Sequence, residues 1–231
     1  MIISGLQKTS LIDYPDKIAA IVFTRGCNFR CGFCHNPELV DPSKYYPEIS
    51  EDEIIEFLKK RKNVLEAVVI TGGEPLIYND IENFIRKVKD IDYLLKLDTN
   101  GTNPDLLQDL INKKLIDYIA MDIKNSLEKY ALTVNTEVDI NNITKSIQII
   151  MLSRLDYEFR STIMPRLFDK QSFYKIGELI KGAKNYYLQQ FRARKTLDPS
   201  FADEFSFGDE EIKEFQEIMQ KYVDKCEIRG I

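Results

Sequence analysis

Short apolar runs alternate with amphipathic helical stretches along most of this chain, and this alternation limits the folds open to it. Strands are predicted over residues 18–24, 67–71, 93–98, 118–123, 158–163 and 186–191. Helices are expected to begin at the caps Ser50, Asn79 and Asn103, and to cover residues 140–152, 173–181 and 209–222. Such alternation favours parallel strands with right-handed crossovers, and about six β/α units are two short of a closed eightfold barrel. We therefore predict an α/β fold, an open partial (β/α)6 barrel with parallel strands.

The length and composition favour one large domain. The chain has 231 residues, of which 44% are hydrophobic, with only 10 Gly and 8 Pro. A chain of this size can bury most of its unfolded surface, and no stretch reads as an interdomain linker. We expect a single domain over residues 1–231, in which residues 192–231 form a C-terminal loop and helix extension of the same domain.

The charge and the cysteine content narrow the class of protein. The 32 Lys and Arg residues against 37 Asp and Glu give a net charge of -5, which disfavours a long nucleic-acid groove. No apolar run approaches the roughly 18 residues that a membrane span needs, and no export signal begins the chain. Four cysteines are too few and too clustered for a disulfide framework. We expect a reduced, cytoplasmic protein that binds neither membrane nor nucleic acid.

Three of the four cysteines lie in one short loop after the first predicted strand. Cys27, Cys31 and Cys34 have C-x3-C-x2-C spacing, and this pattern supplies no fourth cysteine ligand. An iron–sulfur cluster held by three thiolates leaves one iron open to a small molecule, whereas a structural metal site closes its coordination with protein groups. Only Cys226 remains, and one thiol cannot hold a second cluster, so we predict a single cluster. Cys226 is expected to pack on a terminal strand.

Three other interpretations of this loop stay open on spacing alone. Cys31 to His35 matches the C-x-x-C-H pattern of covalent haem attachment, although that chemistry belongs outside the cytoplasm. A zinc site from the three cysteines and His35 is a second possibility, although Cys34 and His35 are adjacent and reach one tetrahedral centre with difficulty. A thioredoxin-like redox pair is the third.

Three further polar motifs follow predicted strands. They are Gly72-Gly73-Glu74-Pro75, Asp98-Thr99-Asn100-Gly101 and Asp122-Ile123-Lys124. In parallel α/β folds the loops at the carboxyl ends of the strands converge, so we expect these motifs to meet the cysteine loop. Glycines let a ligand approach the backbone, and a carboxylate can receive an ammonium group.

Asp98 and Asp122 would be neighbours if their strands are adjacent. Two carboxylates about 4 Å apart repel by roughly 4 kcal/mol at an effective dielectric near 20. We therefore expect a positive group between them, either Lys124 or a bound cation. Alternatively, both aspartates only cap turns.

These motifs together resemble a known family. The chain resembles the radical S-adenosylmethionine (radical SAM) enzymes in Cys27-x3-Cys31-x2-Cys34, with aromatic Phe33 before the last cysteine, and in Gly72-Gly73-Glu74-Pro75. The Cys34-His35-Asn36-Pro37, Asp98-Thr99-Asn100-Gly101 and Asp122-Ile123-Lys124 motifs resemble the glycyl-radical-activating branch, which includes the pyruvate formate-lyase activating enzyme. Asp13-Tyr14-Pro15 and the Gly-Cys-Asn-Phe-Arg-Cys context look closest to the anaerobic ribonucleoside-triphosphate reductase activating proteins. The similarity covers roughly residues 1 to 195.

The resemblance implies a fold and cofactors. It implies a barrel of the radical SAM type, with a [4Fe–4S] cluster on Cys27, Cys31 and Cys34 whose open iron takes S-adenosylmethionine. It also implies contacts to S-adenosylmethionine from Phe33 near the adenine, Glu74 at the ammonium, and Gly72, Gly73, Asp98, Asn100, Lys124 and Arg160. A monovalent cation on Asp98, Thr99 and Asp122 is a further implication.

The resemblance also implies an activity, that of a radical SAM oxidoreductase. Reductive cleavage of S-adenosylmethionine at the cluster would give a 5′-deoxyadenosyl radical, which abstracts hydrogen from a glycine of a partner enzyme, with anaerobic ribonucleotide reductase as the expected partner. A flavodoxin- or ferredoxin-like reductant would supply the electron. The alternatives are a radical SAM enzyme acting on a small metabolite, and a noncatalytic iron–sulfur or zinc binding protein. Arg192, Arg194 and Lys195 form either a basic rim for the partner or a solvated charge cluster.

Overall fold

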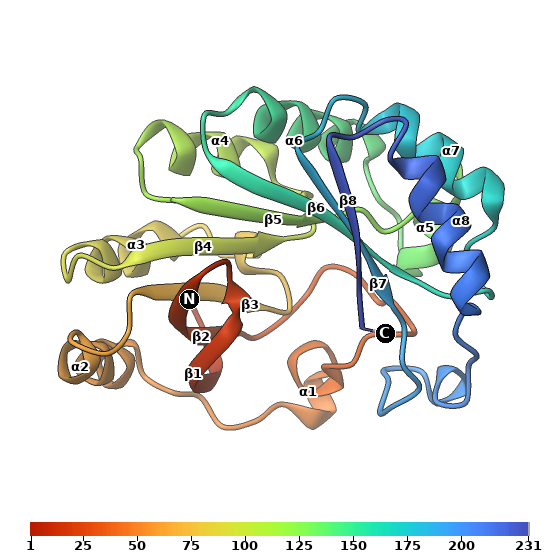
Figure 1. The fold of residues 1–231 in the computed structure, drawn as a ribbon. Coiled ribbons are helices and arrows are strands. Elements are labelled where there is room, and N and C mark those ends of the chain that lie inside the picture. The colour runs from red at the N-terminus through yellow and green to blue at the C-terminus, as the bar shows by residue number, and fades with distance from the viewer. Residues whose placement is uncertain (231) are drawn as a thin grey trace.

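One eight-stranded sheet forms the centre of the molecule. The computed structural model describes residues 1–230, so residue 231 of the expected domain lies outside them. The strands follow chain order, and β2 to β8 are parallel while β1 pairs antiparallel with β2 (Figure 1). The strands are β1 (Ile3–Tyr14), β2 (Lys17–Thr24), β3 (Ala67–Gly72), β4 (Leu94–Thr99), β5 (Tyr118–Asp122), β6 (Asp156–Ile163), β7 (Asn185–Gln190) and β8 (Lys225–Arg229).

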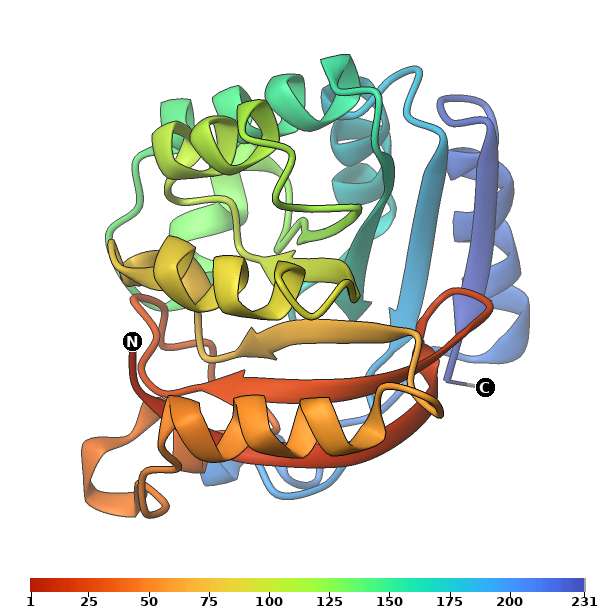
Figure 2. The ribbon, with the colours of Figure 1, turned by 90° about the vertical axis from the view of Figure 1, so that its left-hand side faces the viewer.

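The longer helices cover the outer face of this curved sheet (Figure 2). The helices are α1 (Pro37–Val40), α2 (Glu51–Arg61), α3 (Ile81–Lys89), α4 (Pro104–Asn112), α5 (Tyr130–Val134), α6 (Ile140–Leu152), α7 (Lys170–Leu179) and α8 (Asp209–Met219), with 3-10 turns η1 (Pro42–Lys44), η2 (Pro75–Ile77), η3 (Leu127–Lys129) and η4 (Pro199–Phe201). The sheet order begins at β1 and ends at β8, and no pairing joins these two strands in the part of the chain that the structure describes. The prediction of an open α/β barrel with parallel strands is therefore confirmed for β2 to β8, and the antiparallel β1 was not predicted.

The six predicted strands are all present, and the sheet has two more. β1 lies at the edge of the sheet, and its sequence ISGLQKTSLIDY does not alternate polar and apolar residues, so it carries little strand signal. β8 closes the other end, and it carries the buried Cys226, as expected for a residue on a terminal strand.

The predicted helix caps were correct in two of three places. The side chains of Ser50 and Asn103 accept hydrogen bonds from the backbone of Glu53 and Leu106, as caps do. Asn79 was the wrong cap, because α3 begins after Asp80. Asp80 makes no side-chain cap bond, and its carboxylate accepts a hydrogen bond from the Met1 ammonium at 2.6 Å.

Alternation along the strands separates an apolar layer from a polar interior. On β4, Leu95 and Leu97 belong to the large core that the helices cover, while Lys96 and Asp98 point to the other face. A smaller apolar cluster fills the barrel where the strands begin, and it consists of Tyr14, Ala19, Ile21, Ala67, Val69 and Tyr118. The polar side chains therefore gather nearer the carboxyl ends of the strands. Among the helices described, none has the length and apolar character needed to cross a bilayer.

Candidate active site

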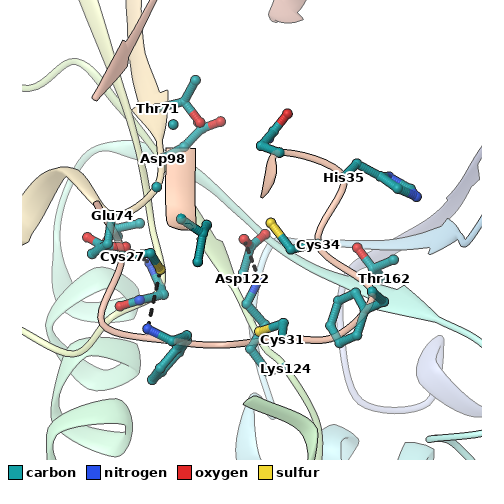
Figure 3. Close-up of a pocket in the computed structure, with 18 of the residues that line it drawn as sticks. Cys27, Cys31, Cys34, His35, Thr71, Glu74, Asp98, Asp122, Lys124 and Thr162 are labelled. Atoms are coloured by element: carbon teal, nitrogen blue, oxygen red, sulfur yellow. Dashed lines mark hydrogen bonds and ion pairs between the residues drawn. The ribbon is translucent and has the colours of Figure 1, made fainter. Parts of the chain in front are cut away.

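A cavity of about 210 Å³ opens at the carboxyl ends of the strands (Figure 3). It brings together the cysteine loop after β2 and the ends of β3, β4, β5 and β6. Every site residue expected from the sequence lies in its wall: Cys27, Cys31, Phe33, Cys34, Gly72, Gly73, Glu74, Asp98, Thr99, Asn100, Asp122, Lys124 and Arg160. The structure thus places these residues in one site, and their individual roles stay predictions.

The cysteine loop is irregular and presents its thiols to the cavity. Cys31 is 7% exposed, and the backbone N–H of Cys34 donates to the Cys31 carbonyl at 3.0 Å. Burial raises the pKa of the Cys27 thiol to about 12 and that of Cys31 to about 11. The Lys124 ammonium opposes this rise at both thiols. Lys124 is therefore a nearby cation that favours thiolates at this loop.

The glycine pair joins the end of β3 to the cysteine loop. The backbone N–H of Gly73 donates to the Thr24 carbonyl at 3.0 Å, and that of Glu74 donates to the Gly26 carbonyl at 2.8 Å. A Cβ atom at Gly73 would lie 1.8 Å from the Gly26 carbonyl oxygen, and Gly72 has φ of 123°. Only glycine fits these two positions, because the backbones are in contact.

Glu74 ties the β3 loop to the end of β4. Its carboxylate accepts hydrogen bonds from the Thr99 hydroxyl at 2.7 Å, the Asn100 backbone at 2.6 Å and the Leu76 backbone at 3.0 Å. Burial raises its pKa to about 7, although these bonds favour the charged form. A methionine ammonium at Glu74 would share the carboxylate with these donors.

The positive group between Asp98 and Asp122 is an arginine. Arg160 donates from Nε to Asp122 at 2.6 Å and from Nη2 to Asp98 at 3.1 Å, while Lys124 pairs with the other oxygen of Asp122 at 2.9 Å. Burial would raise the pKa of Asp122, but Arg160 and Lys124 together lower it below its usual range. The alternative that Asp98 and Asp122 only cap turns is therefore wrong. The predicted monovalent cation would share this place with the Arg160 guanidinium.

Several groups of this site were not anticipated. Thr71 and Thr162 also line the cavity. Behind Arg160, Glu158 forms a bidentate ion pair with Arg229 of β8, and both N–O distances are 2.8 Å. The alternation of Glu158, Arg160 and Thr162 along β6 was the available signal, because every second residue of a strand shares one face.

Three basic residues after β7, Arg192, Arg194 and Lys195, are not among the described residues that line the cavity. Arg192 donates from Nε to the Gly230 carbonyl at 2.9 Å, and Lys195 pairs with Glu38. His35 stacks on Phe191 with ring centroids 5.1 Å apart. Of the basic rim expected to meet the partner, Lys195 therefore has its charge paired within the chain, while Arg192 keeps its charge and only donates to a neutral carbonyl.

The three thiols are a donor set that suits an iron–sulfur cluster. Within residues 1–230, no three His, Cys, Asp or Glu side chains converge around a single ion position. The three cysteines line the cavity beside apolar Phe29 and Val40. Thiolates are the ligands that iron–sulfur clusters take, and apolar surroundings limit access of solvent to them.

The sequence match decides the family. The sequence model of the radical SAM superfamily matches residues 21–171, which span the cysteine loop and the polar ends of β3 to β6. The chain belongs to the radical SAM superfamily. Membership implies a [4Fe–4S] cluster and S-adenosylmethionine, and the haem, zinc and thioredoxin-like interpretations of the cysteine loop are therefore set aside.

Relatives of this radical SAM protein cover most of its length. "Putative glycyl-radical enzyme activating enzyme MJ1227" of Methanocaldococcus jannaschii is 34% identical over 238 residues, covering 100% of this chain and 96% of the relative. The pyruvate formate-lyase-activating enzyme of Clostridium pasteurianum is 24% identical over 191 residues, covering 78% of this chain and 77% of the relative.

Solved structures share the fold. SuiB of Streptococcus suis bound to S-adenosylmethionine superposes with a TM-score of 0.64 at 17% identity, over 91% of this chain. This chain spans about half of that structure, 52% of its length, and at this identity the likeness concerns the fold alone.

Proposed function

We propose that this radical SAM protein is an activating enzyme that generates a glycyl radical on a partner enzyme. The observation that carries the proposal is the 34% identity to MJ1227 along the whole chain, together with the C-x3-C-x2-C loop in its cavity. We also propose an anaerobic ribonucleotide reductase as the partner. The support for that choice is the Asp13-Tyr14-Pro15 motif and the Gly-Cys-Asn-Phe-Arg-Cys context.

In this proposal the chain's residues bind and orient the cofactors. Cys27, Cys31 and Cys34 hold the cluster, and Gly72 and Gly73 let S-adenosylmethionine approach the backbone. When bound, the cluster and S-adenosylmethionine supply one-electron cleavage and hydrogen abstraction from a glycine. The electron comes from a flavodoxin- or ferredoxin-like protein.

The charged group around Arg160 would orient the polar end of S-adenosylmethionine. Arg160 binds Asp98 and Asp122, and Asp122 also binds Lys124, so these charges are fixed before the ligand binds. Fixed charges need no reorganisation during a reaction, and this lowers the cost of placing a charged ligand. Buried apolar groups on the cysteine loop limit water at the cluster.

An anaerobic assay tests the proposal. The reconstituted protein with reduced flavodoxin and S-adenosylmethionine should yield 5′-deoxyadenosine, and a co-incubated anaerobic ribonucleotide reductase should acquire a glycyl radical detected by electron spin resonance. Absence of 5′-deoxyadenosine would count against a radical SAM activity. Product without a glycyl radical on any glycyl-radical enzyme would favour a small-molecule substrate instead.

The cysteines give a direct prediction for cluster content. Cys31→Ala should lose the iron and sulfide of the reconstituted protein, because it removes a proposed ligand. Cys226→Ala should retain both, because Cys226 is buried in β8 and is absent from the cavity wall described here. Iron and sulfide analysis after anaerobic purification makes the comparison, and equal loss in both variants would contradict the ligand assignment.

A further inference from the structure

The segment after β7, residues 192–208, docks on the outer side of the cysteine loop. The backbone N–H of Leu197 donates to the Cys34 carbonyl at 2.9 Å, and that of Asp198 donates to the Gly32 carbonyl at 3.0 Å. Neither Leu197 nor Asp198 is among the described residues that line the cavity. The loop that carries the three thiols therefore has the cavity on one side and this segment on the other.

Phe201 is the side chain that fills this contact. It is 7% exposed, and a Cβ atom at Gly32 would lie 2.4 Å from its ring. The backbone of Gly32 does not occupy the left-handed region, so the ring of Phe201, rather than the backbone, excludes a side chain there. The ring of Phe33 lies 6.3 Å from that of Phe201, centroid to centroid.

Arg166 contacts the face of the Phe201 ring. Its guanidinium lies 3.8 Å from the centroid of the Phe201 ring, and its Nη1 donates to the Ser200 carbonyl at 3.1 Å. A cation over an aromatic face is an attractive contact. Arg166, Phe201 and Gly32 thus form a stack that runs from the loop after β6 to the cysteine loop.

The cysteine loop depends on contacts with other segments, because it has no regular secondary structure of its own. Residues 25–36 contain no helix or strand, so their backbone is held by single hydrogen bonds and side-chain packing. Groups behind metal ligands set ligand orientation, and their loss costs roughly 10–100-fold in metal affinity or activity. Phe201 contacts the two residues that lie between Cys31 and Cys34.

We propose that Phe201 is a positioning residue that holds the Cys31–Cys34 turn in the geometry needed by the cluster and covers its outer side. Through Phe33, it also orients the adenine end of S-adenosylmethionine. This inference rests on the proposed binding of a [4Fe–4S] cluster and S-adenosylmethionine, and it adds a residue that does not line their cavity.

The test compares Phe201→Ala with Phe205→Ala in the anaerobically reconstituted, full-length protein. Phe205 lies in the same segment but is 79% exposed, so it is a matched control. We expect Phe201→Ala to lose iron to a ferrous chelator roughly tenfold faster than the wild type and to bind S-adenosylmethionine more weakly, while Phe205→Ala matches the wild type in both. Equal behaviour of the two variants would overturn the inference while leaving the proposed function intact. Wild-type protein that holds no cluster would instead overturn the proposed function and, with it, this inference.

A second pair of variants separates positioning from loss of stability. Gly32→Ala alone should also speed iron loss, because the new methyl group meets the Phe201 ring. Adding Phe201→Ala removes that clash, so the double variant should lose iron no faster than Phe201→Ala. Additive effects would mean that the ring and the glycine act independently, against the proposal.

Folding is checked by circular dichroism of the metal-free proteins. If Phe201→Ala fails to fold, Arg166→Gln takes its place, because Arg166 is partly exposed and supports the ring from outside. It should speed iron loss in the same direction by a smaller factor. An unchanged rate of iron loss in Arg166→Gln would then count against Phe201 as a positioning residue.

Discussion

Arg160 and Gly73 illustrate how single residues build this site. Arg160 comes from β6, yet it reaches the carboxylates at the ends of β4 and β5 and neutralises their mutual repulsion. Gly73 directly follows β3 and touches the backbone of the cysteine loop. In both cases the residue acts by occupying a place between two segments, so its importance lies in the contact across segments and not in its own strand.

Gly73→Ala should damage both stability and cluster binding. Its methyl group would lie 1.8 Å from the Gly26 carbonyl oxygen, and no flexible side chain can move aside there. Overpacking of this kind costs typically about 1–3 kcal/mol of unfolding free energy. Denaturant unfolding of the metal-free protein measures the cost, and iron analysis measures the cluster.

Gly208→Ala is the matched control. Its nearest neighbour is the end of the Glu211 side chain at 3.4 Å, which can move. We expect a change within about 0.5 kcal/mol, typical of surface substitutions. A loss in Gly73→Ala no larger than in this control would show that the cysteine loop can retreat from the glycine pair.

At the scale of elements, β8 is tied to β6 across β7. Arg229 bridges to Glu158 while its guanidinium stacks 3.3 Å above the centroid of the Tyr187 ring. Glu158 also accepts a hydrogen bond from the Tyr118 hydroxyl at 3.1 Å, so the same carboxylate reaches β5. The Arg229–Glu158 ion pair therefore joins β8 and β6, which do not pair with each other through their backbones.

This link predicts a pH-dependent stability. Burial would raise the pKa of Glu158, but Arg229 and Lys96 lower it below its usual range. A carboxyl whose folded pKa is lowered stabilises the protein above its unfolded pKa, about 4.3 for glutamate, and this stabilisation is lost as the pH falls through the folded pKa. Glu158→Gln should therefore cost on the order of 2 kcal/mol at pH 7, and the difference from the wild type should shrink in acid.

Denaturant unfolding at a series of pH values measures this difference. The control is Glu227→Gln on β8, whose ion pair with Lys225 is exposed and contributes little. A Glu158→Gln deficit that is constant from pH 7 into acid would contradict the assignment of a charged, paired Glu158.

At the scale of the whole molecule, one apolar core reaches from Ile3 near the start of the chain to Cys226 near its end. The C-terminal elements belong to it: Phe215 of α8 stacks on Phe173 of α7 with centroids 4.1 Å apart. β8 then extends the same sheet beside β7. Residues after 171, which lie beyond the superfamily match, thus belong to the same apolar core as the matched residues.

A shared core predicts one cooperative unfolding transition for the metal-free protein. Near- and far-ultraviolet circular dichroism should report the same midpoint, since neither part can lose its packing alone. An earlier transition confined to the C-terminal part would contradict the expected single domain.

The sequence by itself determined the local features of this protein. Apolar periodicity located the six inner strands, and the cysteine spacing with the polar strand ends located the site, because these signals depend on neighbours along the chain. Only the tertiary structure decided the pairing of β1, the position of Arg160 between two aspartates, the ion pair of Asp80 with the Met1 ammonium, and the packing of Phe201 against Gly32. Each of these depends on partners far apart in sequence, which are brought together only when the sheet curves and the core closes.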